Sequence, residues 1–174
     1  MKYLVKFFVV TFFLIVCTHV LAEQKVVYMD MKFVLNNSQA GKGAQDYLKK
    51  TFKEKQKKFS DMEKNLKKEE DDLLAKKKIL TKTEYTEKMN NLRKKVIDYQ
   101  SERRTALDKI AKQKTDAREL LLEKLDPILK SYIKEGNISV VIDKKNILIG
   151  NAELDITNII IDKLNKELPS LSLK

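Results

Sequence analysis

Residues 44–126 contain neither glycine nor proline, and this long uninterrupted stretch limits the chain to few possible folds. Its residues are mostly Lys, Glu, Leu, Asp and Gln, which is the composition of long helices. Helix-breaking residues are absent, so the stretch is expected to be helical throughout.

Apolar residues recur along this stretch with the spacing of a coiled coil. In the first half they recur every seven residues, at Phe52, Phe59, Leu66, Leu73 and Leu80, with Leu48 and Met62 at the companion position. In the second half the spacing alternates between four and three, through Tyr85, Met89, Leu92, Val96, Tyr99, Ala106, Ile110, Ala117 and Leu120. Polar residues interrupt both repeats, namely Lys55, Glu69, Lys76, Arg103 and Gln113. Each half therefore has one apolar stripe that needs a partner helix.

Two arrangements satisfy this pattern. In the first, the halves fold back on each other near residues 75–88 as an antiparallel hairpin, whose arms of about 40 residues reach ~60 Å. Thr81 and Thr83 can cap a new helix there, although the turn lacks the usual Gly or Pro. In the second, one continuous rod of ~120 Å pairs with other chains. The first stripe weakens and changes pattern at Leu80, which favours the hairpin.

Short strands are expected on both sides of the helical stretch. Residues 25–30 read as one strand, and residues 139–142 and 147–149 read as a β-hairpin around the polar sequence DKKN. An antiparallel arm brings its two ends together, so these strands are expected to meet at its base. Two helices complete this body: residues 119–133, which are rich in leucine, and residues 154–168, where Asp155 or Thr157 can cap a run of isoleucines. The fold class expected is α+β, mostly α.

The body is expected to associate with copies of itself. Its strands carry apolar residues on both faces, and such a small sheet leaves its edges unpaired. The residues expected at the contact are Val26, Val27, Tyr28, Val140, Val141, Ile142, Ile147 and Ile149. The expected organisation is a body formed by residues 23–43 and 119–174, with residues 44–118 as the arm.

The first 22 residues have the features of a cleaved secretory signal. Lys2 and Lys6 precede an apolar run, and residues 20–22, Val-Leu-Ala, suit a signal peptidase. A membrane anchor is the alternative, but the apolar run at residues 7–16 is short for a bilayer. A lipoprotein signal at Cys17 is a second alternative, although Val16 stands where such signals need a small residue.

Cleavage after Ala22 removes the only cysteine and the only histidine. The mature chain then lacks thiolate and imidazole groups for catalysis, disulfides or a typical zinc site, so we expect no enzyme, no metal and no cofactor. With 34 basic and 25 acidic residues remaining, its net charge is +9. A nucleic-acid binder would explain this charge, but the export signal and the interspersed acidic residues argue against it.

The chain resembles the Skp (OmpH-like) family of periplasmic chaperones for outer-membrane proteins. The most specific match is Val141-Ile142-Asp143, a second short strand at residues 147–149, then Asp155-Ile156-Thr157 opening a helix that reaches Leu164-Asn165. One departure is Ile149, where the family often has an aromatic residue.

The resemblance implies a homotrimer in the periplasm whose small β-barrel body carries three helical arms around a cavity. It also implies that unfolded outer-membrane proteins are held there without ATP. No Gly-rich phosphate loop is present, and we interpret the GKGA sequence at residues 41–44 as a flexible elbow. A structural coiled-coil adaptor or adhesin of the cell envelope is the alternative function.

Client binding needs scattered apolar contacts outside the stripes. Four residues fit this description, Tyr47, Leu74, Ile79 and Ile97, although each is also compatible with a spare apolar position on a polar helix. Lys76, Lys77 and Lys78 at the expected tip are candidates for contact with clients, anionic lipid or lipopolysaccharide. The alternative for the lysines is a solvated end of the first helix, where positive charge is favourable.

Overall fold

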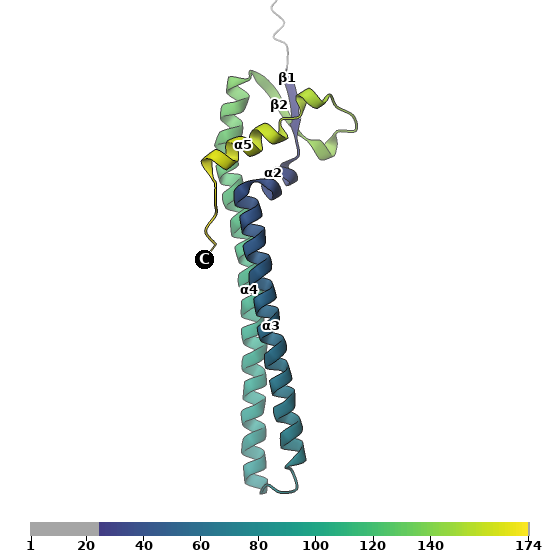
Figure 1. Ribbon diagram of the computed structural model, residues 1–174, viewed down its shortest axis with the longest axis vertical. Helices are drawn as coiled ribbons and strands as arrows, with labels where there is room; N and C mark the ends of the chain where they lie inside the picture. Colours follow the sequence, from purple (N-terminus) through teal and green to yellow (C-terminus); the bar gives the residue numbers. More distant parts are fainter. Residues whose placement is uncertain (1–24, 174) are drawn as a thin grey trace, which may run out of the picture.

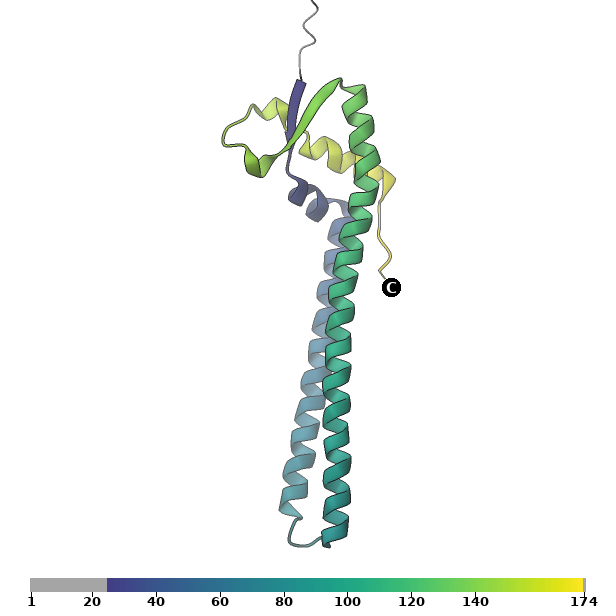
Figure 2. The same cartoon turned by 180° about the vertical axis from the view of Figure 1, so that it is seen from behind.

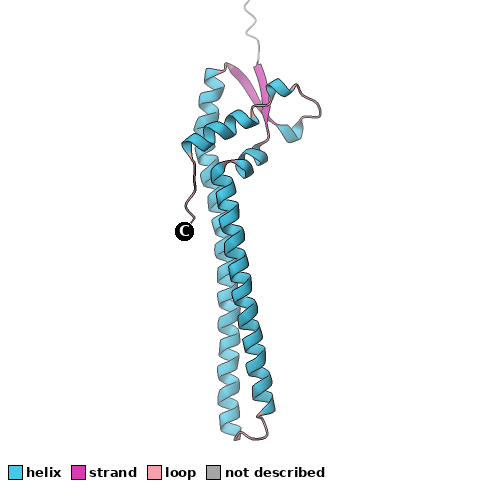
Figure 3. Ribbon diagram, in the orientation of Figure 1, coloured by secondary structure: helices cyan, strands magenta, loops and turns pink. Residues whose placement is uncertain are grey.

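The computed structural model describes residues 25–173, so the predicted signal sequence lies outside the described residues. The chain forms a small body and one long arm (Figure 1). Along the chain the elements are β1 (Lys25–Met29), α2 (Met31–Asn37), α3 (Gln39–Ala75), α4 (Lys82–Glu135), β2 (Ile138–Asp143), the 3-10 helices η1 (Lys144–Asn146) and η2 (Ala152–Leu154), and α5 (Thr157–Glu167). The predicted class, mostly helical with a small sheet, is confirmed (Figure 3).

The arm is an antiparallel hairpin of α3 and α4, as the sequence predicted, and not a continuous rod. With 54 residues against the 37 of α3, α4 is the longer helix and continues past the base of the arm into the body. It also continues through Pro127, which has no backbone N–H to donate to the carbonyl of Glu123 one turn earlier, and Glu123 is exposed.

A capping box forms the turn at the tip of the arm. The Thr81 side chain accepts a hydrogen bond from the backbone of Glu84, and the Glu84 carboxylate accepts one from the backbone of Thr81. Two of the unpaired backbone N–H groups at the helix start are thus satisfied, and the turn forms without glycine or proline. Of the two threonines considered from sequence, Thr81 is the cap and Thr83 lies inside α4.

The stripes meet between α3 and α4 as a seam. Phe59 and Leu73 from α3, with Leu92 and Tyr99 from α4, are buried. The rings of Phe59 and Tyr99 pack edge to face, with centroids 6.1 Å apart. Phe52 departs from the prediction because 45% of it is exposed, whereas Gln113, expected to interrupt the stripe, is buried.

The two strands form a parallel sheet, with Val26 opposite Val140 and Tyr28 opposite Ile142. The two strands are parallel because of the length of α4. This helix runs beyond β1 before the chain reverses, so β2 then runs in the same direction as β1. At the reversal, Asn137 adopts a left-handed backbone (φ 49°), a conformation that asparagine tolerates better than most residues. The chain then returns as β2 in the direction of β1 (Figure 1).

The predicted strand at residues 147–149 is wrong for this chain, and with it the predicted β-hairpin. Within the DKKN sequence, Asp143 ends β2 and the next three residues form η1, and the residues that follow do not pair with β2. They extend away from the body, where Leu148 is 97% exposed and Ile149 is 89% exposed. The apolar run after a polar turn indicated a strand, but strand pairing needs a neighbour that the single chain does not supply.

The core of the body collects residues from both ends of the sequence: Val27, Met29, Val34, Leu35, Ala40, Leu121, Leu125, Ile128, Ile138, Ile156, Ile160 and Leu164. Helix α5 crosses this core and contacts both α2 and α4. The body therefore depends on the arm, because its N-terminal and C-terminal halves meet only when α4 returns beside α3.

The interpretation of GKGA as a flexible elbow is wrong, since both glycines lie in the first turns of α3. Gly41 is buried at the corner between α2 and α3, where a Cβ atom would lie 1.9 Å from the Leu35 carbonyl oxygen. Glycine is needed at this position because the two helices approach closely, and not because the chain must bend.

We expect Gly41→Ala to destabilise the protein by about 2 kcal/mol or more, because α2 and α3 must separate to admit the methyl group. Gly43→Ala is the matched control, since a Cβ atom added at Gly43 would meet no other atom within 4 Å. In a helix interior this change should instead stabilise by about 0.5–1 kcal/mol. Urea unfolding followed by circular dichroism, at one protein concentration, measures both; equal effects of the two substitutions would contradict the close approach.

Candidate interaction surfaces

The arm presents a strongly basic surface. Between residues 44 and 126 there are 24 Lys and Arg against 17 Asp and Glu, a net charge of +7. Two ion pairs join the helices, Lys58 with Glu102 at 3.0 Å and Lys95 with Glu69 at 2.6 Å. All four side chains are about half exposed, so each pair contributes little to stability, about 0–1 kcal/mol.

The four apolar residues selected from the sequence all lie on the surface of the arm. Tyr47 is 43% exposed, Leu74 52%, Ile97 59% and Ile79 82%. They are distributed from the base of the arm to its tip. Two further apolar residues of the arm are exposed, Phe52 and Leu107. The heptad placed Phe52 in the seam, and Leu107 was not among the residues selected from the sequence.

The tip combines exposed lysines with an exposed apolar side chain. Lys76, Lys77 and Lys78 are all exposed, and the Lys77 ammonium lies 5.9 Å from the centre of the Tyr85 ring. Ile79 follows them in the turn. Hydrogen bonds from Thr81 lower the pKa of the Glu84 carboxyl, so the acid that closes the capping box stays ionised under neutral conditions.

The body leaves part of its sheet uncovered. Val26 and Val140 are partners across the two strands, and they are 40% and 49% exposed. Beside the sheet, the segment between η1 and η2 projects from the body (Figure 2) and carries Leu148 and Ile149. Val27 and Tyr28, selected with them from the sequence, are buried within the chain itself, while Val141, Ile142 and Ile147 are half-buried.

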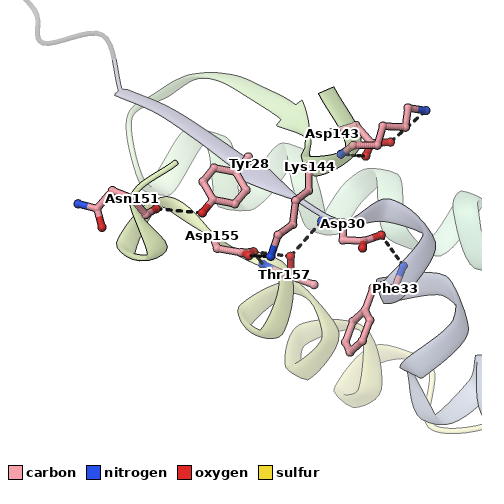
Figure 4. A network of polar contacts seen from close by, with 9 residues as sticks. Tyr28, Asp30, Phe33, Asp143, Lys144, Asn151, Asp155 and Thr157 are labelled. Atoms are coloured by element: carbon pink, nitrogen blue, oxygen red, sulfur yellow. Dashed lines mark hydrogen bonds and ion pairs between the residues drawn. The ribbon is translucent and has the colours of Figure 1, made fainter. Parts of the chain in front are cut away.

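A polar cluster fixes the base of this projecting segment, and we refer to Tyr28, Lys144, Asn151, Asp155 and Thr157 as the latch (Figure 4). The Tyr28 hydroxyl donates to the carbonyl oxygen of Asn151 at 3.1 Å. Lys144 Nζ donates to Asp155 Oδ2 at 2.6 Å and lies 5.8 Å from the centre of the Tyr28 ring. Thr157 donates its hydroxyl to Asp155 and accepts the backbone N–H of Asp30 through Oγ1 at 3.0 Å.

Backbone contacts reinforce the latch. The Ile156 N–H donates to the Tyr28 carbonyl oxygen at 2.9 Å, which joins the start of α5 to β1. Gly150 lies against the Tyr28 ring, where a Cβ would be 2.8 Å from the nearest ring carbon.

Apolar periodicity gave no sign of the latch, although the predicted capping role of Asp155 pointed to it. Asp155 does accept the backbone N–H of Thr157, but the N-cap position of α5 is Ile156.

Two residues of the latch, Asp155 and Lys144, stay charged over a wide pH range. Burial alone would raise the pKa of the Asp155 carboxyl, but hydrogen bonds from Lys144 and Thr157 and the charge of Lys144 lower it overall. The same ion pair raises the pKa of Lys144. The ionised Asp155 therefore stabilises the fold above the pKa of its carboxyl in the unfolded chain, 3.8. The charged Lys144 stabilises it below the pKa of its ammonium in the unfolded chain, 10.5.

Within residues 25–173, no cluster of three or more acidic, cysteine or histidine side chains is arranged to hold a metal ion. No helix in the same residues combines the length and apolar character that crossing a bilayer requires.

Comparison with known proteins identifies similar sequences and folds. A family profile described as "Outer membrane protein (OmpH-like)" matches residues 25–164. A search of curated proteins gave no match. Among solved structures, the fold matches that of a candidate outer membrane chaperone (OmpH-like) from Caulobacter crescentus CB15, with a TM-score of 0.79 and 19% sequence identity. The match covers 89% of this chain and 92% of that chain.

We expect Asp155→Asn to lower the free energy of unfolding by about 1–2 kcal/mol at neutral pH, because Lys144 loses its charged partner. Glu153→Gln, two residues away at an exposed position, is the control and should have almost no effect. The pKa of Asp155 is lowered on folding, so the difference between wild type and Asp155→Asn should persist above about pH 4 and shrink as the pH falls further. Urea unfolding measured across pH 3 to 8 tests this; a difference that does not change with pH would show that the latch is not electrostatic.

Proposed function

Because the chain belongs to the OmpH-like family, we propose that it acts as an ATP-independent holdase for unfolded outer-membrane proteins in the periplasm. This is a periplasmic family of chaperones and not of enzymes, and its description implies outer-membrane proteins as clients. The observation that carries the finer proposal is the arm itself, a long basic hairpin with exposed apolar residues from its base to its tip.

Charge supplies the first step of capture. Acidic unfolded chains are attracted to a surface of net charge +7, over a screening distance of ~8–10 Å at physiological salt. This attraction accelerates the encounter and weakens as salt increases. It does not require a defined client sequence.

Scattered apolar contacts supply the second step. Tyr47, Leu74, Ile79 and Ile97 are separate on the arm, so an unfolded client can bind several of them without adopting one conformation. Each contact is weak, and the client remains free to fold when it reaches the membrane. Lys76, Lys77 and Lys78 extend the basic surface to the tip, and their contact with anionic lipid or lipopolysaccharide is a further part of the proposal.

Assembly into a homotrimer would place several arms around one space. Within the described part of the chain, β2 pairs only with β1, so its other edge is open. Ile147 has extended backbone angles and begins the apolar segment that projects from the body. We propose that residues 147–149 of one copy add to the sheet of the next, with Val26 and Val140 buried at the same contact. Head-to-tail pairing of this kind closes into a ring when the rotation permits.

The holdase proposal is tested with residues 23–174, following removal of the predicted signal sequence. A urea-unfolded outer-membrane barrel protein is diluted into the pure chain without nucleotide, and the solution mass is measured by light scattering after size exclusion. We expect a trimer that gains the mass of one client, and capture that slows as salt is raised. A stable oligomer that leaves the client to aggregate would instead support a structural adaptor of the envelope.

Assembly is tested by replacing Leu148 and Ile149 with aspartate. Both side chains are almost fully exposed in the single chain, so the change should leave its own fold within about 0.5 kcal/mol of wild type. At an interface, the two carboxylates would be buried without partners, which costs several kcal/mol. We therefore expect a helical monomer. Ile79→Asp at the distant tip is the control and should remain trimeric; retention of the trimer by the double aspartate variant would disprove this contact.

A further inference from the structure

The described chain ends in a tail, residues 168–173, which the family match does not cover because it ends at residue 164. The tail follows α5 and contains neither helix nor strand. Leu168 is the C-cap of α5, and Pro169 ends the helix there, because proline disfavours helical backbone angles in the residue before it. From α5 the tail runs beside α4 toward the arm, as both views show (Figures 1 and 2).

Burial of leucine side chains holds the tail on the body. Leu168, Leu171 and Leu173 are half-buried, and the first two pack against the core of the body. The residues between these leucines are exposed. The last hydrogen bond of the described chain joins the Leu168 N–H to the Leu164 carbonyl oxygen at 2.8 Å, and residues 169–173 make none. The tail therefore lies on the body as a bound apolar peptide would, without the backbone pairing that fixes a strand.

Binding of this kind does not depend on one sequence. A site that pairs with the backbone fixes the register of its ligand, whereas an apolar surface needs only apolar side chains at a similar spacing. The hydrophobic gain from three half-buried leucines is opposed by the conformational entropy lost in ordering the residues around them. The tail can therefore leave the surface at a small cost in free energy, and another extended apolar segment can replace it.

We propose that the surface beneath the tail binds an extended apolar segment of an unfolded client, and that the tail occupies this surface until a client displaces it. The inference rests on the proposed holdase function and adds a site on the body to the exposed residues of the arm. The tail itself indicates the occupant: Leu171, Ser172 and Leu173 alternate apolar and polar residues, as the strands of a membrane barrel do. While docked, the tail also covers apolar surface that would otherwise promote association.

The first experiment deletes residues 169–174 and keeps Leu168, whose hydrogen bond completes the end of α5. The probe is a fluorescent peptide with the sequence of residues 168–174, LPSLSLK, and fluorescence anisotropy measures its binding. A tethered tail competes at an effective concentration of about millimolar, so the peptide should bind the shortened chain at least about tenfold more tightly than the full mature chain. An unfolded outer-membrane barrel protein should displace the peptide, and should bind the shortened chain at least about threefold more tightly than the full chain.

The second experiment keeps the full length of the chain, so it tests the site even if the deletion unfolds the body. Leu171→Ser with Leu173→Ser removes the side chains that hold the tail, and Ser170→Ala with Ser172→Ala is the matched control at exposed positions. The leucine variant should bind peptide and client as the shortened chain does, and the serine variant should behave as wild type. Circular dichroism and light scattering give the helical content and the solution mass of each variant.

Failure of the peptide to bind both the shortened chain and the leucine variant would overturn the site. Peptide binding with an unchanged or weaker client affinity would overturn the client role and leave the tail as a brace of the body. A lower solution mass after the deletion would assign the surface to contact between copies instead. If wild type and variants all capture no client, the holdase function fails, whereas the peptide comparison still decides whether the surface binds an apolar segment.

Discussion

The antiparallel return of α4 beside α3 is the constraint on which the rest of the structure depends. It brings β1 and β2 together although more than 100 residues separate them, and it places α5 across a core drawn from both ends of the chain. Because α4 is 17 residues longer than α3, it runs beyond β1 before the chain reverses, and the two strands become parallel. The sheet is thus a consequence of the lengths of the two helices more than of its own sequence.

The arm could be predicted from sequence because its signal is repeated many times. A stripe that recurs from Leu48 to Leu120 tolerates errors at Phe52 and Gln113 without changing the conclusion. The turn was predictable as far as two candidate caps, Thr81 and Thr83, since a cap acts within four residues and needs no tertiary partner, and the structure selects Thr81. Local and repeated interactions are therefore recovered from sequence, even where the usual glycine or proline is missing.

The remaining features could not be predicted because they depend on neighbours distant in sequence. Residues 147–149 are a short apolar run after a polar turn, as a strand would be, yet no strand of the described chain lies beside them. Gly41 looks like a flexible residue until the Leu35 carbonyl oxygen is placed against it. The latch joins Tyr28 to Asn151 and Lys144 to Asp155, pairs that only the folded body brings together. Each of these three features depends on tertiary packing, which the periodicity of the sequence does not reveal.

The same chain combines a body held by specific contacts with an arm held by weak ones, and the difference follows from burial. In the body, the Asp155 side chain is 20% exposed, and its hydrogen bonds with Lys144 and Thr157 lower the pKa of its carboxyl although burial raises it, so these contacts persist over a wide pH range. In the arm, cross-helix ion pairs are half exposed and charged residues interrupt the seam. An assembly surface must have one geometry to recognise a second copy, whereas a surface for unfolded chains must adapt to many. Placing the polar network at the base of the projecting segment and the charged interruptions in the seam satisfies both requirements within one fold.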